Sequence, residues 1–159
     1  MATSIFDIDF KLLKKQGIKY IAFDADSTLV SSRGKKMEEK AKQFLQRELQ
    51  IFDGTCIASN RITNDLGDIG EDLNAKVIRA SLLLRKPAKG FFARVIDHFQ
   101  ARPSEIAMVG DKLVADIYGA NRAGLKAVWV DKMGKDNILD RLFHTRHFEA
   151  RMMRKYTKS

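Results

Sequence analysis

The sequence predicts an α/β fold in which a parallel five-stranded sheet carries helices on both faces. Short apolar runs rich in β-branched residues alternate with helix-like stretches, and this alternation is typical of βαβ units. The chain has 159 residues, of which 45% are hydrophobic and 31% are charged, so we expect one globular domain over residues 1–159. The sequence contains no internal repeat and no low-complexity linker that would divide it.

The expected elements follow one another in a regular order. The five strands are KYIAFD (19–24), TCIAS (55–59), AKVIR (75–79), EIAMVG (105–110) and KAVWV (126–130). The four helical stretches between them are KKMEEKAKQFLQREL (35–49), NDLGDIGEDLN (64–74), AKGFFARVIDHFQ (88–100) and KLVADIYGANRAG (112–124). In the first helix Met37, Ala41 and Leu45 recur at helical spacing on one face. Gly124 stands where a glycine commonly ends a helix.

The composition limits the kinds of protein that this chain can be. A single cysteine, Cys56, excludes an internal disulfide and indicates a reducing compartment. The sequence has no apolar run of signal-peptide or membrane-spanning length, so we expect a cytoplasmic protein, with a membrane-peripheral position as the alternative. The formal net charge of +9 predicts attraction to an anionic partner, or else a solvated basic surface with no specific partner.

The pattern Phe-Asp-x-Asp occurs twice, at residues 6–9 and 23–26, and the context of the two copies differs. No strand precedes the first copy and a short helix follows it, so Asp9 is expected to cap that helix. In the second copy, Asp24 and Asp26 lie at the carboxyl end of a buried strand. Ligands bind at that end in open α/β sheets, so the second pair is the expected catalytic one.

Three other strand ends also carry polar residues. Ser59 and Asn60 follow the second strand, Lys86 comes after the third, and Asp111 and Asp116 follow the fourth. Each of them alone has a simple structural explanation as a turn residue, a solvated cation or a helix cap. Because the carboxyl ends of parallel strands meet at one edge of a sheet, we expect these side chains to lie together and to form one site.

These four segments resemble the four motifs of the haloacid dehalogenase-like (HAD) phosphatase superfamily, with FDADST, SN, KP and GDKLVAD in their places. The sequence is most similar to the class IIIA, YqeG-type branch, which is related to the phosphatidylglycerophosphate phosphatases. That similarity includes LLKKQGIKYIAFDADSTLV, VGDKLVADIYGANRAGL and ARMMRKY. The resemblance implies a three-layer, Rossmann-like HAD fold. Two residues depart from the branch: Ser27 replaces the usual asparagine, and Arg61 adds a cation that bears on substrate preference.

The residues at the strand ends suit phosphoryl transfer, which requires mainly positioning and charge neutralisation. We expect Asp24 to attack phosphorus and form an aspartyl-phosphate, the role that the resemblance also implies. Asp26 is expected to protonate the leaving oxygen and then to activate water. Lys86 would neutralise charge on the nucleophile and the phosphate, Ser59 would hold a phosphate oxygen, and Asn60 would assist it.

Several carboxylates at one place repel each other, and a divalent cation relieves that repulsion. We expect Mg²⁺ because this ion prefers oxygen ligands and keeps several waters. Asp24 and Asp111 would be ligands through their carboxylates. The resemblance implies that Asp26 contributes its backbone carbonyl rather than its side chain. Asp116 would stay outside the ligand shell and orient a water molecule or Lys86.

Members of this superfamily often carry a cap domain that closes over small substrates, inserted after the first motif or before the lysine motif. Here the two segments are residues 29–36 and 80–85, and neither is long enough for an independent core. We therefore expect no cap domain and an open site. Such a site suits a bulky phosphomonoester on a lipid, a protein or a nucleic-acid end, whereas a covering subunit in an oligomer would suit small substrates.

The C-terminal segment over residues 136–159 is basic and amphipathic. Phe148, Met152 and Tyr156 recur every four residues among arginines and lysines. A helix of this kind can lie on an anionic membrane surface. The alternative is a last helix that packs on the sheet and keeps its charged face in solvent.

The sequence therefore predicts a Mg²⁺-dependent phosphatase that forms an aspartyl-phosphate. Phosphatidylglycerophosphate is the first candidate substrate, and a sugar phosphate, a nucleotide or a phosphoprotein is the alternative. A basic nucleic-acid-binding module is the alternative of another class. It is disfavoured because the sequence shows no aromatic stacking platform, no helix-turn-helix pattern and no zinc signature.

Overall fold

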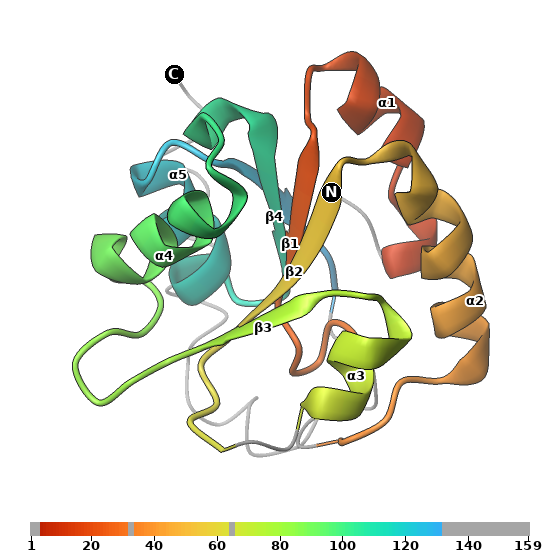
Figure 1. The fold of residues 1–159 in the computed structure, drawn as a ribbon, viewed down its shortest axis with the longest axis horizontal. Coiled ribbons are helices and arrows are strands. Elements are labelled where there is room, and N and C mark those ends of the chain that lie inside the picture. The colour runs from red at the N-terminus through yellow and green to blue at the C-terminus, as the bar shows by residue number, and fades with distance from the viewer. Residues whose placement is uncertain (1–3, 32–33, 64–65, 132–159) are drawn as a thin grey trace.

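The computed structural model describes residues 4–31, 34–63 and 66–131, and within them five parallel strands form one sheet (Figure 1). The strands are β1 (Tyr20–Phe23), β2 (Gly54–Ser59), β3 (Lys76–Arg79), β4 (Ile106–Gly110) and β5 (Lys126–Trp129). Their order in the sheet is β3-β2-β1-β4-β5. The predicted parallel α/β fold is thereby confirmed. Because Phe23 of β1 is in register with Ile57 and Val109, the carboxyl ends of the three central strands lie at the same edge.

Helices cover both faces of the sheet, as the sequence predicts (Figure 1). On one face lie α1 (Phe10–Lys15), α2 (Glu39–Glu48) and α3 (Gly67–Asp72), and on the other lie α4 (Lys89–Phe99) and α5 (Gly119–Arg122). Shorter turns are η1 (Ile5–Asp7), η2 (Leu49–Ile51) and η3 (Pro103–Glu105), which are 3-10 helices, and η4 (Leu113–Tyr118), which is a π-helix.

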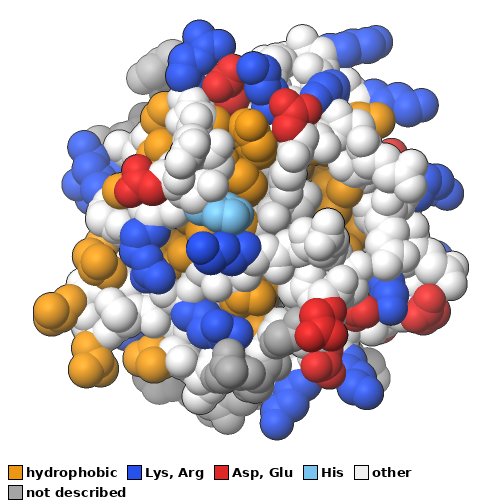
Figure 2. All heavy atoms as spheres, in the orientation of Figure 1, with side chains coloured by type: hydrophobic (Ala, Val, Ile, Leu, Met, Phe, Trp, Pro, Cys, Tyr) orange, Lys and Arg blue, Asp and Glu red, His pale blue; other side chains and the backbone are white. Residues whose placement is uncertain are grey.

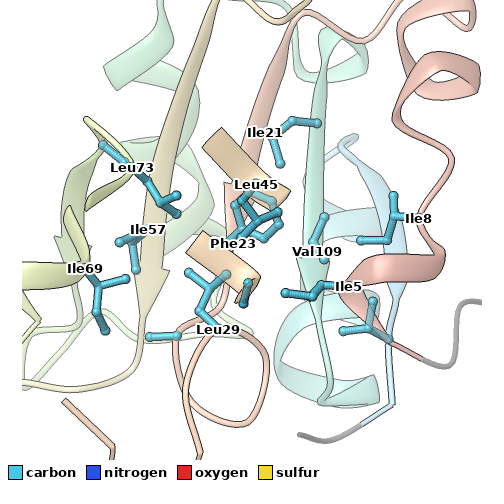
Figure 3. Packing of buried hydrophobic residues seen from close by; sticks show 14 of the residues in the cluster. Ile5, Ile8, Ile21, Phe23, Leu29, Leu45, Ile57, Ile69, Leu73 and Val109 are labelled. Atoms are coloured by element: carbon cyan, nitrogen blue, oxygen red, sulfur yellow. The ribbon is translucent and has the colours of Figure 1, made fainter. Parts of the chain in front are cut away.

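Successive side chains of a strand point to opposite faces, so each strand contributes to two hydrophobic cores. Ile21 and Phe23 of β1 belong to the core beneath α1, α2 and α3, where Leu45 of α2 packs on them (Figure 3). Ala22, between them, belongs to the core beneath α4 and α5, with Phe92 of α4. Because both faces of the sheet are packed in this way, the backbone at the carboxyl ends of the strands is held in place. The side chains that project from it therefore have fixed backbone positions.

Two of the predicted helical stretches differ most from the sequence-based expectation. The stretch predicted as one helix over 112–124 is a π-helical turn, η4, followed by α5, and Gly124 ends it with a φ of +86° as expected. The backbone N–H of Ile117 donates to the carbonyl of Lys112, five residues earlier, which widens this turn. The first predicted helix, over 35–49, is shorter, since α2 begins only at Glu39.

The predicted amphipathic segment over 136–159 lies outside the described residues. In the described ranges, no helix combines the length and the apolar character that crossing a membrane requires.

Candidate active site

The predicted site residues lie together at the edge formed by the carboxyl ends of the strands. Asp24 and Asp26 follow β1, Ser59 ends β2, and Asp111 follows β4. Lys86 comes from the loop after β3 and reaches across β2 to Asp24. The hydrogen bonds described below join all of them, together with Asn60 and Asp116, into one network.

Lys86 is the centre of this network. Its Nζ donates to Asp24 Oδ1 at 2.6 Å, to Asp116 Oδ1 at 2.6 Å and to the carbonyl of Ala58 at 2.7 Å. The side chain of Lys86 is buried, which lowers its pKa, but the carboxylates of Asp116 and Asp24 raise that pKa by more. Lys86 is therefore a fixed, buried positive charge that two acids share.

Asp116 reaches Lys86 because the chain leaves room for it. A Cβ atom on Gly110 would lie 2.5 Å from Asp116 Cγ, so only glycine fits at the end of β4. The other carboxylate oxygen, Oδ2, accepts from the backbone N–H of Lys112 at 3.1 Å. Burial raises the pKa of Asp116 and the neighbouring charge of Lys86 lowers it, with a net rise. Both oxygens of Asp116 thus accept hydrogen bonds, one from the Lys86 side chain and one from the Lys112 backbone.

Asn60 is bonded to the backbone of Lys86 on both sides of its side-chain amide. Its side-chain Oδ1 accepts from the backbone N–H of Lys86 at 2.8 Å, and its Nδ2 donates to the carbonyl of Lys86 at 3.1 Å. This pair of bonds fixes the backbone that carries the lysine. Ser59 is fully buried, and its Oγ accepts from the backbone N–H of Arg61 at 3.1 Å.

Lys112 is the site residue that sequence reasoning missed. Its Nζ donates to Asp24 Oδ2 at 3.1 Å, to Asp111 Oδ1 at 3.2 Å and to the carbonyl of Asp26 at 3.5 Å. Burial lowers its pKa, but the acids that surround it, with Asp24 first, raise that pKa by more. The sequence places Lys112 directly after Asp111, so its nearness to the site was predictable. The direction in which its side chain points was not.

The three oxygen atoms that contact Lys112 are those predicted to bind Mg²⁺. All three oxygen atoms contact the same positive charge, the ammonium of Lys112. In addition, one carboxylate oxygen from each of Asp24, Asp111 and Asp116 lies within 4.8 Å of the other two. Asp111 Oδ2 is buried and has no hydrogen-bond partner in the part of the chain that the structure describes. The pKa of Asp111 is raised to about 6, because burial, the largest cause, and the nearby charge of Asp24 raise it by more than Lys112 lowers it. This set of oxygen atoms fits a hard divalent cation.

Arg61 is paired with Asp26 rather than directed at solvent. Its Nε lies 3.1 and 3.0 Å from the two carboxylate oxygens of Asp26, and its Nη2 donates to the carbonyl of Gly34 at 2.9 Å. The side chain of Arg61 is 11% exposed and that of Asp26 is 24% exposed. A planar guanidinium that contacts both oxygens fixes the orientation of a carboxylate, so Arg61 sets where the Asp26 oxygens point.

Similarity to known proteins extends over the same segments. A family model described as HAD-hydrolase-like matches residues 83–142, a range that includes Lys86, Asp111 and Asp116. Phosphatidylglycerophosphate phosphatase 1 of Arabidopsis thaliana (chloroplastic/mitochondrial) is 30% identical over 136 residues, which are 80% of this chain and 38% of that protein. The probable phosphatase YqeG of Bacillus subtilis is 25% identical over 127 residues, which are 80% of this chain and 72% of that protein.

A third relative matches over a shorter stretch. The glyceraldehyde 3-phosphate phosphatase of Pyrococcus furiosus is 44% identical over 57 residues, or 36% of this chain and 23% of that protein. YqeG apart, this chain therefore spans less than half the length of the relatives described here.

Solved structures share the fold. An uncharacterized protein from Listeria monocytogenes serotype 4b superposes with a TM-score of 0.61 at 21% identity, over 76% of this chain and 84% of that chain. The putative HAD-hydrolase YfnB from Bacillus subtilis, solved with bound magnesium, superposes with a TM-score of 0.51 at 22% identity, over 70% of this chain and 55% of that chain.

Proposed function

We propose that this chain is a Mg²⁺-dependent phosphatase of the haloacid dehalogenase-like superfamily, a proposal supported by its similarity to the HAD-hydrolase-like family model, to phosphatidylglycerophosphate phosphatase 1 and to YqeG. The reaction is the hydrolysis of a phosphomonoester through an aspartyl-phosphate on Asp24. The observation that carries the proposal is that Lys86 and Lys112 each contact one oxygen of Asp24, while Asp111 lies beside them. Phosphoryl transfer depends on such positioning and charge neutralisation.

Asp24 is the nucleophile because its carboxylate is held in one orientation at the mouth of the sheet. Lys86 holds Oδ1 from within the protein, while Lys112, whose side chain is 45% exposed, covers Oδ2. Movement of Lys112 into solvent opens Asp24 to the substrate without disturbing the core. In the first step, an Asp24 oxygen forms a bond to phosphorus as the bond to the leaving oxygen breaks.

Asp26 transfers the protons of both steps. It donates a proton to the leaving oxygen, and it takes a proton from the water that then attacks phosphorus and releases Asp24. Arg61 contacts both oxygens of Asp26 and therefore positions this acid–base group. Ser59 donates its hydroxyl to a phosphate oxygen, since its bond to Arg61 uses it only as an acceptor.

The donor set described above supports the magnesium part of the proposal. Asp24, Asp111 and the carbonyl of Asp26 would hold Mg²⁺, which when bound neutralises the charge of the transferring phosphoryl group. We place Asp116 outside this set, because its oxygens accept from the buried Lys86 ammonium and from a backbone N–H, whereas Asp24 Oδ2 is held by the half-exposed side chain of Lys112. Asp116 is a positioning residue that holds Lys86 toward Asp24.

A lipid phosphate such as phosphatidylglycerophosphate is the first candidate substrate. Two relatives, the Arabidopsis enzyme and YqeG, match along most of this chain, and the former bears that activity in its name. The segments 29–36 and 80–85 are too short for a cap domain, so we propose an open site that admits a bulky headgroup. The net charge of +9 favours an anionic substrate of this kind.

The experiment that tests this function measures phosphate release from lipid, sugar, nucleotide and peptide phosphates, with Mg²⁺ and with EDTA. We expect hydrolysis only with Mg²⁺, and the highest kcat/KM for the lipid phosphate. Equal rates in EDTA would contradict the metal assignment, and no hydrolysis of any substrate would contradict the phosphatase itself. An Asp111→Asn variant should require a higher Mg²⁺ concentration for the same rise in melting temperature, which tests the ligand independently of turnover.

A further inference from the structure

Exposed apolar side chains are concentrated at the edge of the molecule that carries the candidate site. Leu82 and Leu83, in the loop between β3 and α4, are 89% and 91% exposed, and Ile62, in the loop after β2, is 61% exposed. Figure 2 shows hydrophobic side chains that protrude at the lower left, where Figure 1 shows the loop between β3 and α4. In water such side chains contribute no stability to the fold, so they indicate an interaction surface.

The two leucines are held out by a structured turn. The backbone N–H of Ser81 donates to the carbonyl of Leu84 at 2.9 Å, and the N–H of Leu84 donates to Ser81 Oγ at 3.2 Å. Leu84 packs on α4, because a Cβ atom on Gly90 would lie 2.8 Å from its Cδ2. Leu82 and Leu83 therefore occupy the two central positions of a closed turn, and inserting them elsewhere costs little conformational entropy.

The same turn is joined to the catalytic lysine. Lys86 lies two residues beyond Leu84, its backbone is bonded on both sides to Asn60, and its Nζ contacts Asp24. A surface into which the two leucines insert would therefore lie next to the site, at a fixed distance from Asp24. A docking loop anchored in this way can deliver a substrate that lies in that surface.

The charges around the turn indicate which surface it is. Arg85 and Lys89, both exposed, come shortly after the leucines in the chain, and the whole chain has a net charge of +9. An anionic bilayer accepts apolar side chains at the level of its acyl chains and basic side chains at the level of its phosphates. The order of residues here, with apolar residues at the tip and cations behind it, matches that layering.

We propose that Leu82 and Leu83 insert into an anionic lipid bilayer and hold the site against its headgroups. This inference deepens the proposed function, on which its catalytic part rests, because it names the physical state of the substrate. The phosphate of a lipid then reaches Asp24 from the membrane surface, beside the turn that has entered the bilayer.

The test compares a Leu82→Ser/Leu83→Ser variant with a control, Leu12→Ser/Ile51→Ser, which removes two exposed apolar residues of α1 and η2. Flotation with vesicles of phosphatidylcholine and phosphatidylglycerol measures binding. We expect the wild type and the control to float, and the Leu82→Ser/Leu83→Ser variant to show a partition coefficient at least about tenfold lower. Vesicles of phosphatidylcholine alone should bind the wild type more weakly.

Activity separates this inference from the proposed function. The Leu82→Ser/Leu83→Ser variant should hydrolyse p-nitrophenyl phosphate at the wild-type rate but lose activity on a lipid phosphate in vesicles. Should the wild type hydrolyse neither substrate, the phosphatase proposal fails, while flotation still decides the membrane surface.

Three outcomes would overturn the membrane assignment. Equal flotation of the leucine variant and the wild type is the first. A lower melting temperature of the variant without vesicles would show that the leucines pack on another part of the chain. A change of oligomeric state in light scattering, with unchanged flotation, would show a contact between copies of the chain.

Discussion

The two Phe-Asp-x-Asp segments, at residues 6–9 and 23–26, have the same pattern but opposite surroundings. In the first, both acids are exposed, and Asp9 accepts a hydrogen bond from the backbone N–H of Leu12 at 2.8 Å, which caps α1 as the sequence predicts. In the second, Asp24 is buried and each of its oxygens contacts a lysine.

The difference shows that the environment of a carboxylate, rather than the local pattern, decides what it can do. An exposed acid at a helix start stabilises the helix by a modest amount and needs no other partner. A buried acid is costly unless cations compensate its charge, so the cluster of Asp24, Asp111 and Asp116 depends on the two lysines that it surrounds. The predictions that follow test this contrast with paired substitutions.

The largest difference is expected between Asp24→Asn and Asp9→Asn. Loss of the proposed nucleophile should reduce kcat at least about 1,000-fold. Asparagine caps a helix about as well as aspartate, so Asp9→Asn should leave kcat unchanged and alter the free energy of unfolding by less than about 0.5 kcal/mol. Phosphate-release kinetics and urea unfolding measure the two effects, and equal kcat values for the two variants would remove the contrast.

A second pair compares the lysines near the two segments. Lys86→Met leaves Asp24 and Asp116 buried beside each other, and we expect a loss of about 3–5 kcal/mol in the free energy of unfolding. Lys14→Met removes an exposed pair with Asp53, whose atoms are 3.1 Å apart, and should cost less than about 1 kcal/mol. Urea unfolding measures both losses. Comparable values would mean that the buried network contributes no more to the free energy of unfolding than an exposed ion pair does.

Arg61→Gln tests how Asp26 is held. Without the guanidinium, Asp26 loses its fixed orientation, so we expect kcat to fall about 10- to 100-fold with little change in KM. Arg61→Lys should recover only part of this loss, because an ammonium group cannot contact both oxygens in the same way. The matched control is Arg47→Gln, since Arg47 pairs with its neighbour Glu48 on α2, far along the chain from the site. An unchanged kcat for Arg61→Gln would leave Arg61 without a positioning role.

Lys112→Met gives the smallest expected effect. Its ammonium contacts the oxygens that we assign to Mg²⁺, so lysine and cation compete for them. Removal of the lysine should lower the Kd for Mg²⁺ about fivefold, which corresponds to the roughly 1 kcal/mol of a half-exposed ion pair. Melting temperatures over a Mg²⁺ titration measure this change. The same Kd in both proteins would place the metal elsewhere.

The sequence predicts most of the fold, because the alternation of strands and helices is a local pattern. The five strands agree with the prediction to within one residue at every end, and their parallel arrangement is as predicted. The strand ends also locate Asp24, Lys86 and Asp111 at one edge, since topology alone brings them together. Their catalytic roles remain predictions for the experiments above.

Contacts between distant side chains were not predictable in the same way. The pairing of Arg61 with Asp26 and the inward direction of Lys112 depend on side-chain geometry that no local pattern specifies. The φ of +63° at Ser27 is another case. Asparagine is favoured in the left-handed conformation, which gives a physical reason for the residue usual in the similar branch and shows that serine is less well suited here.

The measurement that tests the central claim most directly identifies the residue that carries the phosphoryl group. Turnover of a substrate is stopped with borohydride, which reduces an aspartyl-phosphate to homoserine, and mass spectrometry locates the reduced residue. The account predicts reduction at position 24, dependent on substrate and Mg²⁺, with Asp7, Asp9 and Asp26 unmodified. Reduction at another acid, or none during active turnover, would contradict it.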